Sequence, residues 1–268
     1  MTMIGDYDEL ITASCDRFFG YGAVTAPVWF IGKQEGGGKN WDECRRRLDV
    51  WHKRGRRDIE DVVGYHRAFG EDCWFADPPK IQSTWRELIR LRLAMANEPI
   101  SPDSIGHYQV HRLAGWNGEN CLLELLPLAS GDPNDSKIYE ANSNLDWLKK
   151  RKALMTEYGR KRALRLRTMI DEHRPQVVIL YSLSDEFQPL WRLISGFDFA
   201  ETELPYTTYA ARDRISYLII PHPGRVSRLH LSAPTFFREV GSFVMARLRE
   251  ASPNPPTGPT LRKRVSSV

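Results

Sequence analysis

One stretch decides the fold of this chain: Pro27-Val28-Trp29-Phe30-Ile31-Gly32-Lys33-Gln34-Glu35-Gly36-Gly37-Gly38. An apolar run rich in β-forming residues ends at Gly32, and polar residues and three more glycines follow it. A buried parallel strand that ends in a functional loop has this pattern. Because ligands bind outside the carboxyl ends of parallel strands, we expect Gln34 and Glu35 to lie at a binding crevice. The alternative is a glycine-rich turn with a solvated Glu35.

Three further apolar runs, at residues 121–128, 177–181 and 217–220, alternate with helical patterns. This alternation predicts an α/β protein: a three-layer α/β/α fold with a central, mainly parallel four-stranded sheet. We expect a single domain over residues 1–251 and a disordered tail over 252–268, which is rich in proline and basic residues. A turn is expected at residues 20–22, and helices at 7–19, 40–53, 58–67, 83–97 (ended by Pro99 and Pro102), 145–173, 185–194 and 233–250.

The chain carries 38 basic and 34 acidic residues among 268, a formal net charge of +4. This balance permits nucleic-acid binding without arguing for it. Cys15, Cys44, Cys73 and Cys121 form no C-x-x-C spacing, so we expect no metal site and no cofactor. The sequence has no signal peptide and no apolar run of about 18 residues, so we expect a cytoplasmic protein that does not contact membranes. We also expect a monomer.

Polar residues that do not belong in a core stand at the ends of three expected strands. Gln34 and Glu35 follow the first strand, Glu124 lies on the second, and His222 follows the fourth. In a parallel sheet these ends converge on one crevice. Two carboxylates and a histidine in one cleft suit hydrolysis through a cationic transition state.

The order of these motifs resembles the uracil-DNA glycosylase superfamily over about residues 27–230. Gly32-Lys33-Gln34-Glu35-Gly36 is similar to the family's first motif, G-Q-D-P-Y or G-E-A-P-G. His222-Pro223-Gly224 is similar to its last motif, H-P-S, after the final strand. Glu124-Leu125-Leu126-Pro127-Leu128 resembles N-L-C-P-L, in which the Asn reads the base, and residues 174–180 resemble the family's P-x-V-I-V strand.

The resemblance implies a catalytic role for three residues of the crevice. Gln34 stands where the family has the Asp or Asn that directs water, and a Gln amide positions water but is a poor base. We therefore expect Glu35 to supply the negative charge, with Gln34 acting alone as the alternative. His222 is expected to donate to the base O2 as negative charge builds on the leaving group, with a structural histidine as the alternative.

The resemblance also implies which residues contact the base. Glu124 replaces the Asn that pairs with uracil, and an ionised carboxylate only accepts hydrogen bonds, so it suits the N4 amino group of cytosine and repels uracil O4. The alternative is a structural Glu paired with an arginine. Gly36 and Gly37 leave room for a bulky substituent at C5, and Trp74 or Phe75 is expected to stack on the base.

Basic residues are expected to contact the DNA backbone. Lys33, Arg225 and Arg228 flank the first and last motifs. Residues 149–167 hold nine basic residues and one acidic residue, and Lys149, Lys152 and Arg160 represent this segment. A solvated basic face is the alternative.

The residues and the resemblance together predict a monofunctional DNA glycosylase that flips a nucleotide out of double-stranded DNA. The expected substrate is a modified cytosine. Phage-defence glycosylases that excise glucosylated hydroxymethylcytosine from phage DNA are the family members that fit. The alternatives are a uracil or deaminated-base repair glycosylase and a catalytically inactive DNA-binding module, the latter because Gln34 stands where a water-activating residue is usual.

Overall fold

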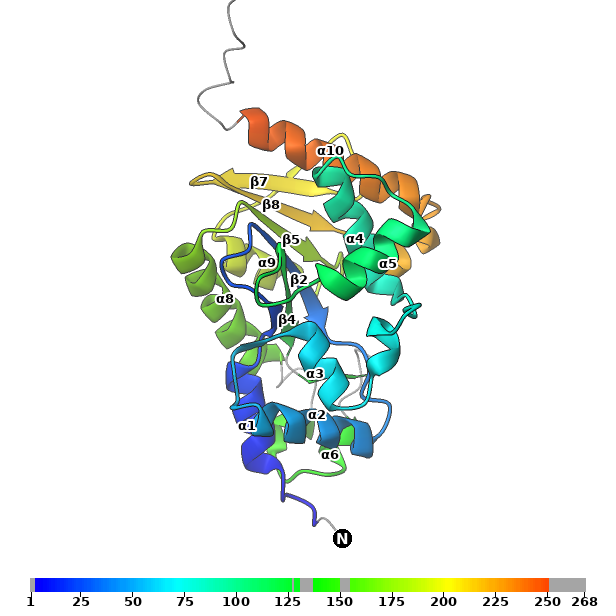
Figure 1. Ribbon diagram of the computed structural model, residues 1–268. Helices are drawn as coiled ribbons and strands as arrows, with labels where there is room; N and C mark the ends of the chain where they lie inside the picture. Colours follow the sequence, from blue (N-terminus) through cyan, green and yellow to red (C-terminus); the bar gives the residue numbers. More distant parts are fainter. Residues whose placement is uncertain (1–2, 127, 131–136, 150–154, 251–268) are drawn as a thin grey trace, which may run out of the picture.

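The computed structural model describes residues 3–126, 128–130, 137–149 and 155–250, and one mixed sheet of eight strands runs through it (Figure 1). The strand order in this sheet is β3-β1-β4-β2-β5-β8-β7-β6. The strands are β1 (Gly20–Gly22), β2 (Val28–Gln34), β3 (Ile59–Glu60), β4 (Asn120–Leu126), β5 (Val177–Tyr181), β6 (Ala200–Glu201), β7 (Thr208–Arg212) and β8 (Ile215–Ile220).

The four expected strands are β2, β4, β5 and β8, and they lie side by side in the middle of the sheet. All three pairings between them are parallel, with Gly32 opposite Glu124 and Ile31 opposite Leu180. The α/β class is therefore confirmed. The sheet is larger than expected, because short strands extend it at both edges.

The expected turn at residues 20–22 is in fact strand β1, which pairs antiparallel with β4. Gly20 and Gly22 have positive φ values of 138° and 119°. A Cβ on Gly20 would lie 2.1 Å from the carbonyl oxygen of Leu122, and one on Gly22 would lie 2.5 Å from that of Asn120. These glycines therefore mark a close approach of two backbones, and they place Tyr21 beside β4.

Helices cover both faces of the sheet (Figure 1). Trp29 of β2 packs with α8 and α9 on one face, and Phe30 packs with α4 and α10 on the other, because successive side chains of a strand point to opposite faces. No helix in the described ranges is long and apolar enough to cross a bilayer. The helices are α1 (Asp8–Arg17), α2 (Trp41–Lys53), α3 (Val62–Ala68), η1 (Asp72–Phe75), α4 (Ser83–Met95), α5 (Pro102–His111), α6 (Lys137–Glu140), η2 (Asp146–Lys149), η3 (Met155–Gly159), α8 (Arg160–His173), α9 (Gln188–Ser195), η4 (Pro223–Leu229) and α10 (Ala233–Glu250).

Three helical expectations are wrong in detail. The expected helix at residues 58–67 begins with strand β3, and only α3 (Val62–Ala68) is helical there. The described part of residues 145–173 is divided into η2, η3 and α8 instead of forming one helix. Pro102 does not end a helix but begins α5, where Ser101 and Ser104 form a capping box. Proline suits this position because the first N–H groups of a helix have no intrahelical partner. The expected tail, residues 252–268, lies outside the described residues.

A buried arginine joins several elements near the carboxyl edge of the sheet. The guanidinium of Arg162 in α8 donates to four backbone carbonyls, those of Leu125 at 2.7 Å, Cys15 at 2.8 Å, Phe18 at 2.8 Å and Glu124 at 2.9 Å. Burial lowers the pKa of Arg162 to about 10, so the group stays charged at neutral pH. This contact fixes the end of β4 against α8 and the residues around the end of α1.

Arg162→Met should lower the free energy of unfolding by about 3 kcal/mol or more, because the buried carbonyls lose their donor. Urea unfolding followed by circular dichroism measures this loss. Arg165→Met is the matched control on the exposed side of α8, and it should change stability by less than about 0.5 kcal/mol. Equal losses in the two variants would contradict the structural role of Arg162.

Candidate active site

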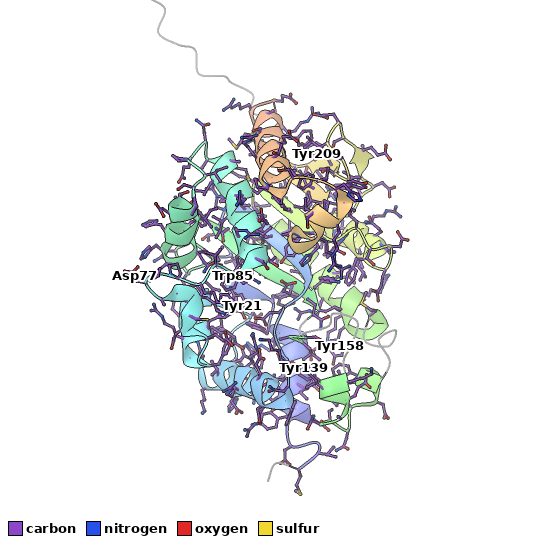
Figure 2. The ribbon with its side chains drawn as sticks, turned by 90° about the vertical axis from the view of Figure 1, so that its right-hand side faces the viewer. Tyr21, Asp77, Trp85, Tyr139, Tyr158 and Tyr209 are labelled. Atoms are coloured by element: carbon purple, nitrogen blue, oxygen red, sulfur yellow. The ribbon has the colours of Figure 1, made fainter. Side chains whose placement is uncertain are left out.

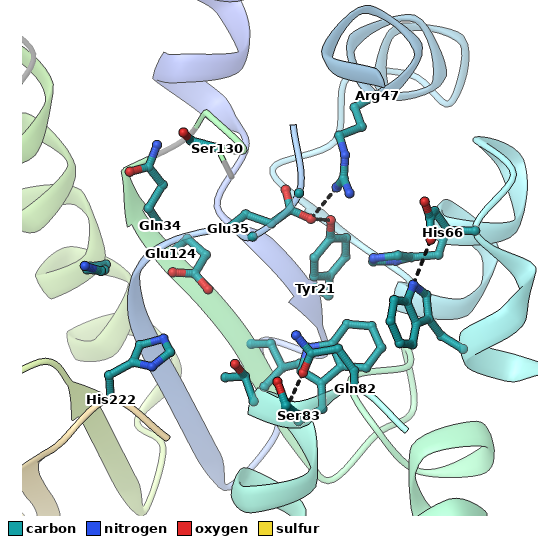
Figure 3. Close-up of a pocket in the computed structure, with 18 of the residues that line it drawn as sticks. Tyr21, Gln34, Glu35, Arg47, His66, Gln82, Ser83, Glu124, Ser130 and His222 are labelled. Atoms are coloured by element: carbon teal, nitrogen blue, oxygen red, sulfur yellow. Dashed lines mark hydrogen bonds and ion pairs between the residues drawn. The ribbon is translucent and has the colours of Figure 1, made fainter. Parts of the chain in front are cut away.

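A pocket of about 650 Å³ opens at the carboxyl ends of the central parallel strands. The structure brings together in it four of the expected residues, Gln34, Glu35, Glu124 and His222. In Figure 3, Glu124 lies between Gln34 and His222, while Glu35 points toward Tyr21 and Arg47. The other side of the pocket is formed by residues of α3, η1 and the start of α4.

Glu35 is held by two donors that bind the same carboxylate oxygen. The Tyr21 hydroxyl donates to Oε1, and Arg47 Nη1 donates to it at 2.8 Å. The Glu35 side chain is only 15% exposed, so the alternative of a solvated turn is wrong. Burial, together with the nearby charge of Glu35, raises the pKa of Tyr21 well above its usual value, so the phenol keeps its proton. Within the described residues no hydrogen bond reaches Oε2, which leaves this oxygen for a water or a ligand.

The glycine loop closes against α2 through Glu43. This carboxylate accepts from the backbone N–H of Gly38 at 2.9 Å and from Arg47 Nη2 at 3.2 Å. Gly37 has a φ of 99°, and a Cβ there would lie 2.5 Å from Arg47 Nη2. A Cβ on Gly36 would meet no described atom within 4 Å. Gly37 is therefore required by the loop itself, and Gly36 borders open space in the pocket.

Glu124 is a partly buried acid with two unlike oxygens. The Tyr181 hydroxyl donates to Oε1 at 3.0 Å, whereas Oε2 is buried without a partner among the described residues. Both side chains lie over Gly32, where a Cβ would come within 2.3 Å of Glu124 Oε2 and of the Tyr181 hydroxyl. Burial raises the pKa of Glu124 to about 8, so the group is mostly protonated at neutral pH.

Two expectations for Glu124 therefore change. The ionised acceptor is wrong, because a carboxyl removed from water favours its neutral form. The alternative of a structural ion pair does not hold either, since the side chain bonds to Tyr181 and Arg162 bonds to the backbone carbonyl of Glu124. A protonated carboxyl both donates and accepts hydrogen bonds, as the Asn amide of the resembled motif does.

His222 is a neutral imidazole with a defined tautomer. Its Nδ1 accepts from the backbone N–H of Gly224 at 3.2 Å, which places the ring proton on Nε2. Burial, and then the charges of Lys33 and Arg225, lower the pKa of His222 to about 4. The ring stands edge-on to Tyr181, with 5.8 Å between the ring centroids. His222 can therefore act as a hydrogen-bond donor at neutral pH without carrying a positive charge.

Gln34 has one of its two polar atoms engaged. Its Nε2 donates to the backbone carbonyl of Leu128 at 2.6 Å. Its Oε1 is buried and has no partner in the described part of the chain. The amide is thus held in one orientation, and Oε1 is the atom that can accept a hydrogen bond from a water.

The remaining expected residues divide into four groups. Gly36, Gly37, Trp74, Lys33 and Arg225 line the pocket. Phe75 is buried against Trp85, so it presents no free face to a base, and Trp74 is the expected aromatic residue that lines the pocket. Trp85 and Tyr21, both labelled in Figure 2, also line it. Arg228 in η4 and Arg160 at the start of α8 are exposed away from the pocket lining, while Lys152 and the side chain of Lys149 lie outside the described residues.

Sequence analysis missed four residues that shape the pocket: Tyr21, Arg47, Tyr181 and Trp85. Tyr21 was hidden in an expected turn, Tyr181 ends the apolar run at residues 177–181, and Trp85 lies in the expected helix at residues 83–97. Arg47 is the last of three consecutive arginines, Arg45 to Arg47, within the expected helix at residues 40–53. Its place four residues after Glu43, on the side of α2 that also carries buried Cys44 and Trp51, was the available signal for a buried role.

Gly37→Ala should destabilise the protein by about 1–3 kcal/mol, because its backbone conformation is strained for alanine and its Cβ would displace Arg47. Gly36→Ala, its neighbour in the same loop, should change the free energy of unfolding by less than about 0.5 kcal/mol. Thermal unfolding of both variants measures the difference. A Gly37→Ala variant as stable as Gly36→Ala would contradict the described loop.

No family model and no curated protein matches this chain. The described residues also contain no cluster of three or more His, Cys, Asp or Glu side chains that could hold a metal ion. The resemblance to the uracil-DNA glycosylase superfamily therefore rests on the motifs around Glu35, Glu124 and His222, and an activity has to be inferred from the pocket itself.

Proposed function

We propose that this chain is a DNA glycosylase that hydrolyses the N-glycosidic bond of a flipped-out base and leaves an abasic site. One observation carries the proposal: Glu35, Glu124 and His222 line one pocket at the ends of adjacent parallel strands, and each has different hydrogen-bond partners. The strand order β4-β2-β5-β8 and the motifs on these strands support a fold like that of the uracil-DNA glycosylase superfamily.

Glu35 is the residue suited to the sugar. When the C1′–N1 bond breaks, the electron pair stays with the base and positive charge grows on the sugar. A carboxylate fixed in advance stabilises that charge without reorganising. Glu35 Oε1 is fixed by Tyr21 and Arg47, and Oε2 then takes the proton of the water that adds to C1′. Gln34 Oε1 accepts a hydrogen bond from the same water.

His222 is the residue suited to the departing base. Its Nε2–H donates to O2 of the pyrimidine, where negative charge grows as the bond breaks. A neutral imidazole is a suitable donor because its charge does not repel the cationic sugar. Burial is the main cause that keeps His222 neutral, and the cations Lys33 and Arg225, which add to it, line the same pocket.

DNA is the proposed partner, held through its phosphates. Lys33, Lys39, Lys80 and Arg225 line the pocket, and cations at the mouth of a base pocket suit the phosphates that flank a flipped nucleotide. Exposed Arg228 in η4 and Arg160 in α8 would extend these contacts along the duplex.

The size and lining of the pocket favour a cytosine that carries a bulky group at C5. Its volume of about 650 Å³ falls among pockets that hold whole small molecules, about 300–1,000 Å³. Opposite Glu124 and His222, the pocket has a lobe that we call the aromatic lobe. Its rings are those of His66, Trp74 and Trp85, and its polar side chains are those of Glu71, Lys80, Gln82 and Ser83. Tryptophan faces suit the C–H face of a sugar, and the polar groups suit its hydroxyls. A glucosylated hydroxymethylcytosine of phage DNA combines these features.

A uracil glycosylase is the second candidate, and one observation favours it. A protonated Glu124 can donate to uracil O4 and accept from its N3–H, as the Asn of the family motif does. Uracil has no group that would use the aromatic lobe. The two candidates therefore differ in whether a sugar on C5 speeds base release.

The test is a panel of matched duplexes that carry uracil, cytosine, 5-hydroxymethylcytosine or its glucosylated form at one position. Mass spectrometry identifies the released base, and alkaline cleavage of the strand counts abasic sites. We expect release to be fastest from the glucosylated duplex. Fastest release of uracil would replace the cytosine proposal with the second candidate, and tight binding without release from any duplex would indicate an inactive DNA-binding module.

Glu35→Gln should lower the single-turnover rate of base release by at least about 10²-fold, because the amide keeps the shape of the carboxylate and loses its charge. His222→Ala should cost about 10²–10³-fold, as for the loss of one donor to a developing anion. Glu239→Gln, on the exposed side of α10, is the control and should keep the wild-type rate. An active Glu35→Gln together with an inactive Gln34→Ala would reverse the roles assigned to these neighbours.

A further inference from the structure

The carboxyl of Glu124 is arranged as a hydrogen-bond donor toward the pocket. Oε1 already accepts from the Tyr181 hydroxyl at 3.0 Å, so it behaves as the carbonyl-like oxygen of an acid. Oε2 is buried and has no partner among the described residues, and Glu124 lines the pocket. A buried polar atom without a partner is costly, and one beside a ligand pocket is best explained by the ligand that would bind it.

The groups around Glu124 favour its neutral form. Burial is the main cause that raises the pKa of Glu124. The hydrogen bond from Tyr181 lowers this pKa, and the negative charge of Glu35 raises it further. The positive charges of Arg162 and Lys33 lower the pKa of Glu124 more weakly. His222 also shares the pocket but is itself neutral, so it contributes no charge.

We propose, resting on the glycosylase function above, that Glu124 is a catalytic acid: its Oε2–H donates to N3 of the flipped cytosine-type base and protonates it as the glycosidic bond breaks. The C1′–N1 bond breaks with its electron pair going to N1, and the proton of Glu124 goes to N3. The base then leaves as a neutral cytosine protonated on N3 instead of N1. Water adds to C1′ and gives its proton to Glu35, so the two carboxyls exchange their protonation states.

Cytosine has a particular need for this acid. Uracil already carries a proton on N3 and spreads its negative charge over two carbonyl oxygens as it leaves. Cytosine has an amino group in place of O4, so its N1 anion is less stabilised, and its N3 is an acceptor. A donor facing N3 therefore improves cytosine as a leaving group, whereas an ionised carboxylate would repel the N3 lone pair.

The same carboxyl also recognises the base. Besides the hydrogen bond from Tyr181, Oε1 has a second lone pair that can accept from the N4 amino group of cytosine. One acid thus makes two hydrogen bonds along the N3–N4 edge. Glutamine reproduces both bonds, through its NH₂ and C=O groups, but it cannot transfer a proton, so Glu124→Gln separates recognition from proton transfer.

The experiment measures single-turnover release of the glucosylated base from about pH 6 to about pH 10, for wild type and Glu124→Gln. The wild-type rate should be constant below about pH 8 and fall about tenfold per pH unit above it. Glu124→Gln should be slower by about 10²–10⁴-fold, as for the loss of a general acid, and should not show this decline. Tyr181→Phe should move the decline to higher pH, because the Tyr181 hydrogen bond lowers the pKa of Glu124.

Binding to a duplex whose target nucleotide carries a 2′-fluorine, which resists cleavage, provides the control for structural damage. Glu124→Gln should bind this duplex with wild-type affinity. A wild-type rate in Glu124→Gln, an unchanged alkaline decline in that variant, or a loss of binding that accounts for its slower rate would overturn the acid role while leaving the glycosylase standing. A wild-type protein that releases no base from any duplex would overturn both.

Discussion

The pocket depends on one buried guanidinium, that of Arg47. It donates to Glu35 at 2.8 Å and to Glu43 at 3.2 Å, and the side chains of all three residues are at most 15% exposed. Removing Arg47 would leave both buried carboxylates without their cation, which is strongly destabilising. A Cβ on Gly37 would lie 2.5 Å from the same guanidinium, so the loop after β2 closes without strain only with glycine there. One cation therefore sets the path of the loop, its contact with α2 and the direction of the Glu35 carboxylate.

The central part of the fold could be predicted because strands buried on both faces appear in the sequence as continuous apolar runs. The edges could not be predicted in the same way. β7 is partly exposed and has no such run, and the glycines of β1 suggested a turn although they serve a close approach to β4. Pro102 was ambiguous for a related reason, since proline both ends helices and begins them, and only the cap formed by Ser101 decides between the two.

Only those residues of the candidate site that stand out in the local sequence could be predicted. Glu35, Glu124 and His222 stand out because polar residues at the ends of apolar strands are unexpected in a core. Their partners are less visible, since Tyr21 and Arg47 become meaningful only through contacts with Glu35 across the fold. The protonation of Glu124 could not be predicted from its neighbours in sequence, because it is set mainly by burial, which depends on tertiary packing.

The two carboxyls of the pocket differ in what happens to them when water is excluded. Glu35 is paired with Arg47, and this buried cation accompanies it whatever covers the pocket. Glu124 is paired with a neutral phenol, that of Tyr181. Burial already raises the pKa of Glu124, so any further loss of water raises it more. In the proposed complex, a duplex that seals the mouth would therefore keep the Glu35–Arg47 pair on the sugar side and a proton on the base side. The proposed hydrolysis of a glycosidic bond to cytosine uses this same division, a cation stabilised at C1′ and a proton delivered to the leaving base, so in this proposal substrate binding itself prepares both groups for the reaction.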